Sequence, residues 1–168
     1  RRVATIDLGQ GERPHCPVFG ADGRLYVTTE VSNSITVIDP RTRAIVEKIP
    51  TGQPESHMLA LTRDGKRAYT SNVGPGTVSA IDLVNRKVTA VIKVAAKAQR
   101  ISLSVDDRRV FTADQGEPRL AVIDTATNTV TQWVALPGIA YGTAPTPDGR
   151  WLLVTLISVN KVAVVDGA

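Results

Sequence analysis

The sequence predicts an all-β fold: a β-propeller of four blades, each with four antiparallel strands, in one domain spanning residues 1–168. Three observations predict it: a turn signal at a fixed spacing, a second landmark in step with it, and two chain ends that complement each other. The turn signal is an aspartate followed by Gly or Asp. It recurs every 42 residues, at Asp22-Gly23, Asp64-Gly65, Asp106-Asp107 and Asp148-Gly149.

The second landmark is an aliphatic residue followed by an aspartate. Its spacings are 43, 42 and 42 residues, and it occurs at Ile38-Asp39, Ile81-Asp82, Ile123-Asp124 and Val165-Asp166. A period near 40 residues that contains several short strands is typical of propeller blades, which bury their faces by stacking on one another.

The first segment, residues 3–9, has the character of a fourth strand. It reads Val-Ala-Thr-Ile-Asp-Leu-Gly and resembles residues 45–52, which close the first repeat. The chain ends just after a third strand, so the last repeat lacks the strand that the N-terminal segment could supply. We therefore expect the N-terminal strand to complete the last blade, which would leave no exposed sheet edge.

The second repeat shows its four strands most clearly. We expect them at residues 57–62, 67–72, 77–82 and 87–94, with alternating patterns in the last two. Gly74-Pro75-Gly76 reads as the turn between the second and third of these strands. No segment of the sequence combines a helical stripe with a helix cap.

The number of repeats leaves the size of the ring open. The chain could close alone on four blades, associate with a second copy into an eight-bladed ring, or form part of a larger ring. Four blades are at the lower end of the range that propellers use, which is about four to eight.

Composition narrows the class of protein. Hydrophobic residues make up 42% of the chain, and no run approaches the roughly 18 apolar residues of a membrane span. The single cysteine, Cys16, excludes an internal disulfide and a thiolate-rich zinc site. The residues after Arg1-Arg2 look like a strand, so we identify no signal peptide in the sequence.

The net charge of +4 is compatible with an acidic partner. Basic residues follow the first and last turns of the repeats, but aspartates occupy the same turns and neutralise them locally. Aromatic residues that could stack on bases are scarce there. We therefore favour a solvated surface over the alternative of a face that binds nucleic acid.

The second strand of each repeat carries a recognisable tetrapeptide. The four versions read Tyr26-Val27-Thr28-Thr29, Tyr69-Thr70-Ser71-Asn72, Phe111-Thr112-Ala113-Asp114 and Leu153-Val154-Thr155-Leu156. With "PDGR" at residues 147–150 and "TVSAID" at 77–82, the whole chain resembles the YVTN-repeat β-propeller family. The resemblance implies a periplasmic, secreted or surface-layer protein that acts in binding or scaffolding. The family's usual seven blades also favour a segment of a larger ring.

One position of the inner strands is polar in every repeat. His15, His57, Gln99 and Tyr141 lie 42 residues apart, and they should form a polar ring at the mouth of the central channel. Imidazoles bind transition metals, and His15 and His57 are the only histidines in the chain. Two histidines need a further ligand, and the candidates in loops on that face are Glu12, Glu30 and Glu55.

The polar ring has two interpretations. The structural one is that these residues order the loops between blades and the waters of the channel. The functional one is that they bind a ligand. Cys16, next to His15, should point to the opposite face and be a buried, inert thiol.

The leading functional hypothesis is a non-catalytic propeller that binds a protein or a small molecule at the channel mouth through His15, His57, Gln99, Tyr141, Glu30 and Glu55. The alternative is a metal- or haem-dependent propeller enzyme that uses His15 and His57, either a lactonase-like hydrolase or a redox protein. The resemblance implies this alternative, because similar propellers carry such activities. The sequence does not identify a cofactor.

Overall fold

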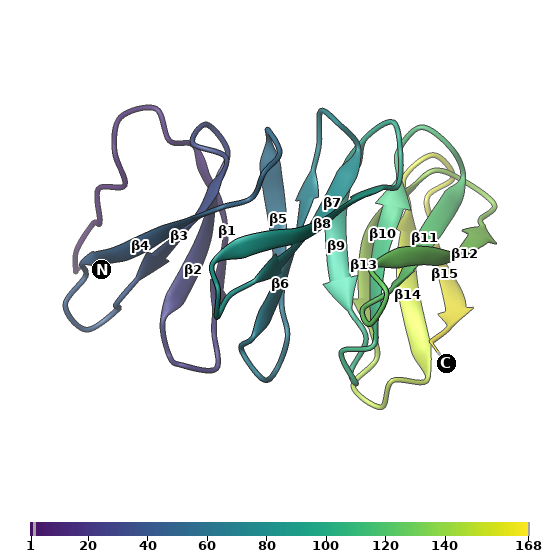
Figure 1. Ribbon diagram of the computed structural model, residues 1–168. Helices are drawn as coiled ribbons and strands as arrows, with labels where there is room; N and C mark the ends of the chain where they lie inside the picture. Colours follow the sequence, from purple (N-terminus) through teal and green to yellow (C-terminus); the bar gives the residue numbers. More distant parts are fainter. Residues whose placement is uncertain (2, 168) are drawn as a thin grey trace.

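The computed structural model describes residues 1 and 3–167 and consists of four antiparallel sheets arranged side by side (Figure 1). Positions 2 and 168 of the predicted domain lie outside this description. The described residues form strands and turns and no helices, which confirms the all-β prediction. The part of the chain that is described therefore has no helix long and apolar enough to cross a membrane.

Each sheet corresponds to one repeat and is called a blade below. Blade one contains β1 (Pro14–Phe19), β2 (Leu25–Thr29), β3 (Ser34–Ile38) and β4 (Ile45–Pro50). Blade two contains β5 (Ser56–Leu61), β6 (Arg67–Asn72), β7 (Thr77–Asp82) and β8 (Lys87–Lys93). Blade three contains β9 (Ala98–Leu103), β10 (Arg109–Asp114), β11 (Arg119–Asp124) and β12 (Thr129–Ala135). Blade four contains β13 (Ala140–Pro145), β14 (Trp151–Leu156) and β15 (Lys161–Asp166).

The strands follow chain order within every sheet, as expected of a propeller blade. In the second repeat the predicted strand bounds differ from the observed ones by at most one residue.

Apolar side chains form one core between each pair of neighbouring blades. Ile35 and Val37 of blade one pack with Leu59, Ala68 and Ile81 of blade two. Equivalent cores join blade two to blade three and blade three to blade four. Because both faces of blade two are covered by its neighbours, β7 is buried at nearly every position.

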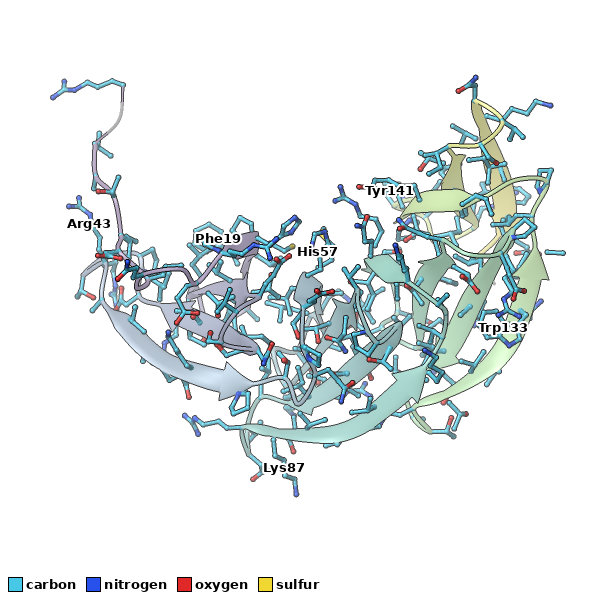
Figure 2. The ribbon with its side chains drawn as sticks, turned by 90° about the horizontal axis from the view of Figure 1, so that it is seen from above. Phe19, Arg43, His57, Lys87, Trp133 and Tyr141 are labelled. Atoms are coloured by element: carbon cyan, nitrogen blue, oxygen red, sulfur yellow. The ribbon has the colours of Figure 1, made fainter. Side chains whose placement is uncertain are left out.

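The four blades form an open arc, with the two ends of the chain at opposite ends of the arc (Figures 1 and 2). The prediction that the N-terminal strand completes the last blade is therefore wrong. Blade four has three strands, and the N-terminal segment instead borders a groove on blade one, where Ile6 and Leu8 lie near Leu25 and Ile38. The arc stays open between its two ends, so these four blades do not form a closed ring by themselves (Figure 2).

The recurring turn signal has a local structural reason. The side chains of Asp22, Asp64, Asp106 and Asp148 each accept a hydrogen bond from the backbone N–H two residues later. The residue directly after the aspartate has a positive φ, which is 76° at Gly23 and 61° at Asp107. Aspartate tolerates this conformation better than most residues, so Asp106-Asp107 can replace Asp-Gly in blade three.

The aliphatic–aspartate pairs act in the same way at the turn between the third and fourth strands. Asp39, Asp82 and Asp124 each accept two backbone N–H bonds. These bonds lower the pKa of Asp39 and Asp124, and the side chain of Asn85 together with the backbone bonds lowers the pKa of Asp82. The landmarks that define the repeat are thus turn-forming residues, and they specify the fold rather than a reaction.

Candidate functional site

The inner strand of every blade carries an irregularity at the same place. The register with the second strand shifts between Pro14 and Pro17 in β1, between Ser56 and Met58 in β5, and between Ala140 and Thr143 in β13. In β9 the shift lies between Ala98 and Ile101. A β-bulge of this kind bends the strand and redirects the side chains within it. The bulges contain His15, His57, Gln99 and Tyr141, the four residues of the predicted polar ring.

Hydroxyl groups from the second strands hold the bulges in place. Thr28 Oγ1 accepts a hydrogen bond from the N–H of Cys16, at 3.0 Å, and donates one to the carbonyl of His57, at 2.7 Å. Ser71 has the same role one blade later, because it accepts from the N–H of Met58 and donates to the carbonyl of Gln99. Each of these hydroxyls therefore connects the bulge of its own blade to that of the next blade.

The bulges turn their side chains toward the concave side of the arc. Figure 2 shows His57 and Tyr141 on this side, whereas Lys87 and Trp133 lie on the convex side. In a propeller the concave side is the wall of the central channel. The residues of the polar ring lie near one end of this wall, together with the loops that connect successive blades.

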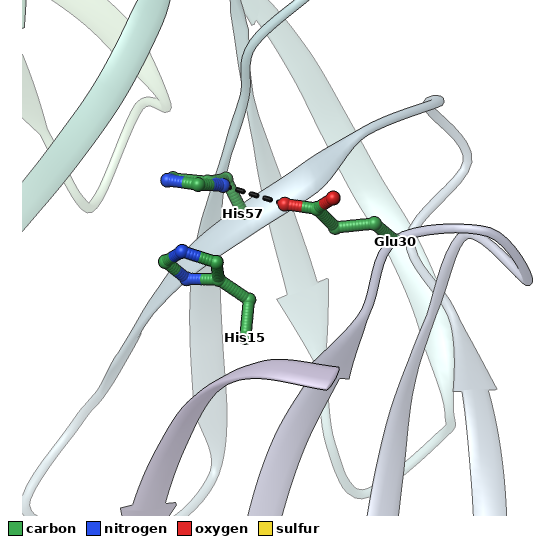
Figure 3. A group of neighbouring side chains, drawn as sticks. All are labelled: His15, Glu30 and His57. Atoms are coloured by element: carbon green, nitrogen blue, oxygen red, sulfur yellow. Dashed lines mark hydrogen bonds and ion pairs between the residues drawn. The ribbon is translucent and has the colours of Figure 1, made fainter. Parts of the chain in front are cut away.

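The two histidines lie against each other. Their ring centroids are 3.5 Å apart and the ring planes are inclined by 32°. His57 Nδ1 is 2.6 Å from Oε1 of Glu30 (Figure 3). Glu30 is a buried carboxylate, and its other oxygen pairs with Arg13 at 3.1 Å. Partial burial lowers the pKa of His15, and the neighbouring His57 lowers it further. The neutral form of His15 is therefore favoured, and a neutral imidazole offers a lone pair to a ligand.

These three residues meet the distance requirement for a common ligand. His15, Glu30 and His57 each offer one donor atom, and the donor atoms lie within 4.8 Å of one another. Of the three glutamates considered in the sequence, Glu30 is the one that reaches the histidines. Glu12 instead pairs with Lys48, at 2.6 Å, and this hydrogen bond lowers the pKa of Glu12.

A small cavity of about 160 Å³ adjoins the histidine pair. Its lining consists of Arg13, Glu30, Glu55, His57, Val73 and Gln99. The structure thus brings Gln99 and Glu55 to the same place as His57 and Glu30, and Gln99 also accepts a hydrogen bond from Gln115. Tyr141 lies farther along the arc, in blade four.

Arg100 was not among the residues that the sequence suggested. Its Nη2 donates to the hydroxyl of Tyr141 at 3.2 Å, its Nη1 is 3.5 Å from the sulfur of Met58, and its guanidinium lies 4.9 Å from the centre of the Tyr141 ring. Its Nε is buried without a hydrogen-bond partner. Among the described residues, no carboxylate pairs with Arg100.

The repeat contained a signal for this arginine. Arg100 occupies the position of Cys16, Met58 and Gly142 in the other repeats, so a charge stands where the other blades have small or apolar residues. Cys16 itself is buried, with its sulfur 3.9 Å from the carbonyl oxygen of Leu59, while His15 is exposed. This confirms the prediction that the two neighbours face opposite ways.

Comparisons with known proteins support the fold. A chain of hydrazine synthase from Kuenenia stuttgartiensis matches with a TM-score of 0.85 and 22% sequence identity, over 99% of this chain and 49% of that chain. The protein thus spans about half the length of the chain that it matches, and the likeness at this identity concerns the fold alone. No curated protein sequence matches the chain.

A family model identifies the sequence more directly. The model described as "Domain of unknown function (DUF5074)" matches residues 17–165, a range that begins within β1 and ends within β15 and so extends over all four blades. The resemblance to the YVTN-repeat family stays a prediction. Because the match extends over most of the sequence, this β-propeller-like chain belongs to the DUF5074 family.

Proposed function

We propose that this protein is a non-catalytic binding module. Its concave surface at the channel mouth holds a partner or small molecule that carries a carboxylate or phosphate group. The observation that carries this proposal is the half-buried guanidinium of Arg100 on an inner strand, which has no carboxylate partner among residues 1 and 3–167.

Burial removes much of the water from a guanidinium, and the cost is normally offset by an ion pair with good hydrogen bonds. Arg100 has five N–H donors, but its partners are the thioether of Met58 and the hydroxyl of Tyr141, and both are neutral. An oxyanion bound beside Tyr141 would supply the missing counter-charge. Partial burial and His57 lower the pKa of His15 most, and the charge of Arg100 lowers it further, so an anion that neutralises Arg100 would change the surroundings of His15.

The remaining polar groups suit recognition. Bulges fixed by Thr28 and Ser71 hold the ring residues in place, and a preorganised site loses little conformational entropy on binding. A binding role requires no more than this surface. The only thiol of the chain, that of Cys16, is buried away from it.

The cellular location is part of the proposal. The resemblance to YVTN-repeat propellers supports a periplasmic or secreted protein, including a surface-layer component. It also supports self-association, or further blades, as the means by which the ring is completed.

The two histidines allow a direct test of anion binding. Both lie on the proposed surface, so a ¹H–¹³C spectrum of the imidazole groups contains only signals from the site. Succinate and sulfate, added at constant pH and ionic strength to metal-free protein, should shift the His15 signal with a saturable dependence on concentration. Chloride at the same ionic strength should not do so.

Arg100→Met keeps much of the aliphatic length of the side chain and removes the charge, so it should abolish the saturable shift. Arg108→Met is the matched control, because Arg108 is exposed and lies in the turn at the opposite end of the same blade. An equal response of both variants would refute the proposal, and so would the absence of any response in the unmodified protein.

A further inference from the structure

We infer that His15, Glu30 and His57 form a binding site for one divalent transition-metal ion. The inference goes beyond the proposed anion binding, because neither Arg100 nor an anion takes part in it. The proposed site consists of three side chains from two blades, and these side chains come together only in the folded protein.

The donor atoms are close to the spacing that a metal requires. Around a tetrahedral ion with metal–ligand distances near 2.0–2.2 Å, donors lie about 3.4 Å apart. Here all three lie within 4.8 Å of one another, and His57 Nδ1 and Glu30 Oε1 are 2.6 Å apart. The metal would replace the proton that this pair shares, and that proton would pass to solvent. His15 is exposed, so its ring can turn out of the stack to bring a nitrogen to the ion.

Neighbouring groups already orient two of the three donors. Glu30 is 8% exposed, and its Oε2 is bound to Arg13, which leaves Oε1 directed at His57. The backbone of His57 is fixed through its carbonyl by Thr28. Groups that hold metal ligands in position in this way typically contribute 10- to 100-fold to metal affinity.

The donor set selects the kind of metal. Two imidazole nitrogens and one carboxylate oxygen, without a thiolate, suit Zn²⁺, Co²⁺, Ni²⁺ or Cu²⁺. Ca²⁺ and Mg²⁺ prefer oxygen ligands only. Three protein ligands leave a coordination position free, and the cavity of about 160 Å³ beside His57 gives room for water or a further ligand there.

Zinc and cobalt titrations of metal-free protein test this inference. At constant pH, calorimetry should show one Zn²⁺ bound per chain with a micromolar or lower dissociation constant, and both imidazole signals should change at one equivalent. Cobalt should give the visible absorption of a site with nitrogen ligands. Each of His15→Ala, His57→Ala and Glu30→Gln should weaken zinc binding about tenfold or more, and Ca²⁺ should not compete.

Gln132→Ala is the control, because Gln132 is exposed on β12, the outer strand of blade three, and should leave zinc affinity unchanged. Circular dichroism checks that each variant is folded. If His57→Ala does not fold, the exposed His15 and the isosteric Glu30→Gln still decide the question. A chain that binds no zinc, or single variants that bind it as well as the parent, would show that the three residues only order the loops.

The outcome is separable from that of the proposed function. Anion binding is measured on metal-free protein and depends on Arg100, whereas zinc binding is measured without the anion and depends on His15, Glu30 and His57. Failure of either experiment leaves the other result in place.

Discussion

Gly76 shows how a single residue determines the contact between two loops. It lies in the turn between β6 and β7 with φ of +62°, and its carbonyl oxygen accepts hydrogen bonds from the N–H groups of Val94 and Ala95. A Cβ atom added at this position would lie 2.1 Å from the carbonyl oxygen of Ala95. The close approach of two backbone segments therefore depends on the missing side chain.

Gly76→Ala should destabilise the protein by more than about 2 kcal/mol, because it adds a backbone clash to an unfavourable φ. Gly11→Ala is the control, since Gly11 also has a positive φ, of 76°, but nothing lies within 4 Å of an added Cβ. It should cost only about 1 kcal/mol. Urea denaturation measures both, and equal losses would contradict the role of the contact with Ala95.

At this scale the sequence predicted part of the site. The spacing of the repeats identified His15 and His57 as equivalent positions, and equivalent positions of neighbouring blades do lie close together. The contact between Glu30 and His57 could not be predicted, because it depends on the side-chain conformation of a loop residue. Arg100 was overlooked since its role follows from the partners that it lacks, and these appear only in three dimensions.

Among the structural elements, the inner strands depart most from a regular pattern. The repeat predicted the bounds of one inner strand, in blade two, to within one residue, but it could not reveal the bulges, because a bulge interrupts the regular pairing that such a prediction assumes. The hydroxyl of Thr28 shows what maintains a bulge. It is fully buried and bonds to the backbone of both Cys16 and His57.

Thr28→Val keeps the shape of the side chain but removes the hydroxyl, which leaves one buried N–H and one buried carbonyl without their partner. We expect a loss of about 2 kcal/mol in the free energy of unfolding. His57 should also shift, visible as a changed imidazole signal. Thr28→Ser keeps the hydroxyl and should preserve that signal, at a smaller cost from the lost methyl group. If both variants behaved alike, packing rather than hydrogen bonding would be what maintains the bulge.

At the scale of the whole molecule, blade four presents a face that the other blades bury. Leu153, Val162 and Val164 are 39%, 58% and 62% exposed. The residues 42 positions earlier, Phe111, Leu120 and Val122, are buried against blade four. By analogy with blade three, this face of blade four has the apolar residues that a further blade would cover. Among the described strands, β15 is the edge strand of its sheet.

We expect the isolated 168-residue chain to self-associate through this face, because contiguous exposed apolar residues favour association. Val164→Lys places a charge opposite Leu153 and should lower the average mass measured by sedimentation over a series of concentrations. Val84→Lys, at an equally exposed position in the turn after β7, is the control and should not change the mass. A parent chain that stays monomeric at every concentration would contradict this expectation.

The repeat thus predicted the blades and their stacking, but not the course of the N-terminal segment. Pairing of residues 3–9 with β15 requires that the ends of the arc meet. That depends on the angle between successive blades, which is set by the sum of many side-chain contacts in three cores. No local sequence pattern records such an angle.

The hydroxyls of Thr28 and Ser71 have a consequence for communication along the channel wall. They form a continuous chain of hydrogen bonds that joins neighbouring bulges, from Cys16 through His57 and Met58 to Gln99. Blade three has Ala113 at the corresponding position, where no hydroxyl is available. The chain of hydroxyl-to-backbone bonds therefore ends at Gln99, and blade four is joined to blade three by side chains instead, through the bond from Arg100 to the Tyr141 hydroxyl and the bond between Ser102 and Thr143.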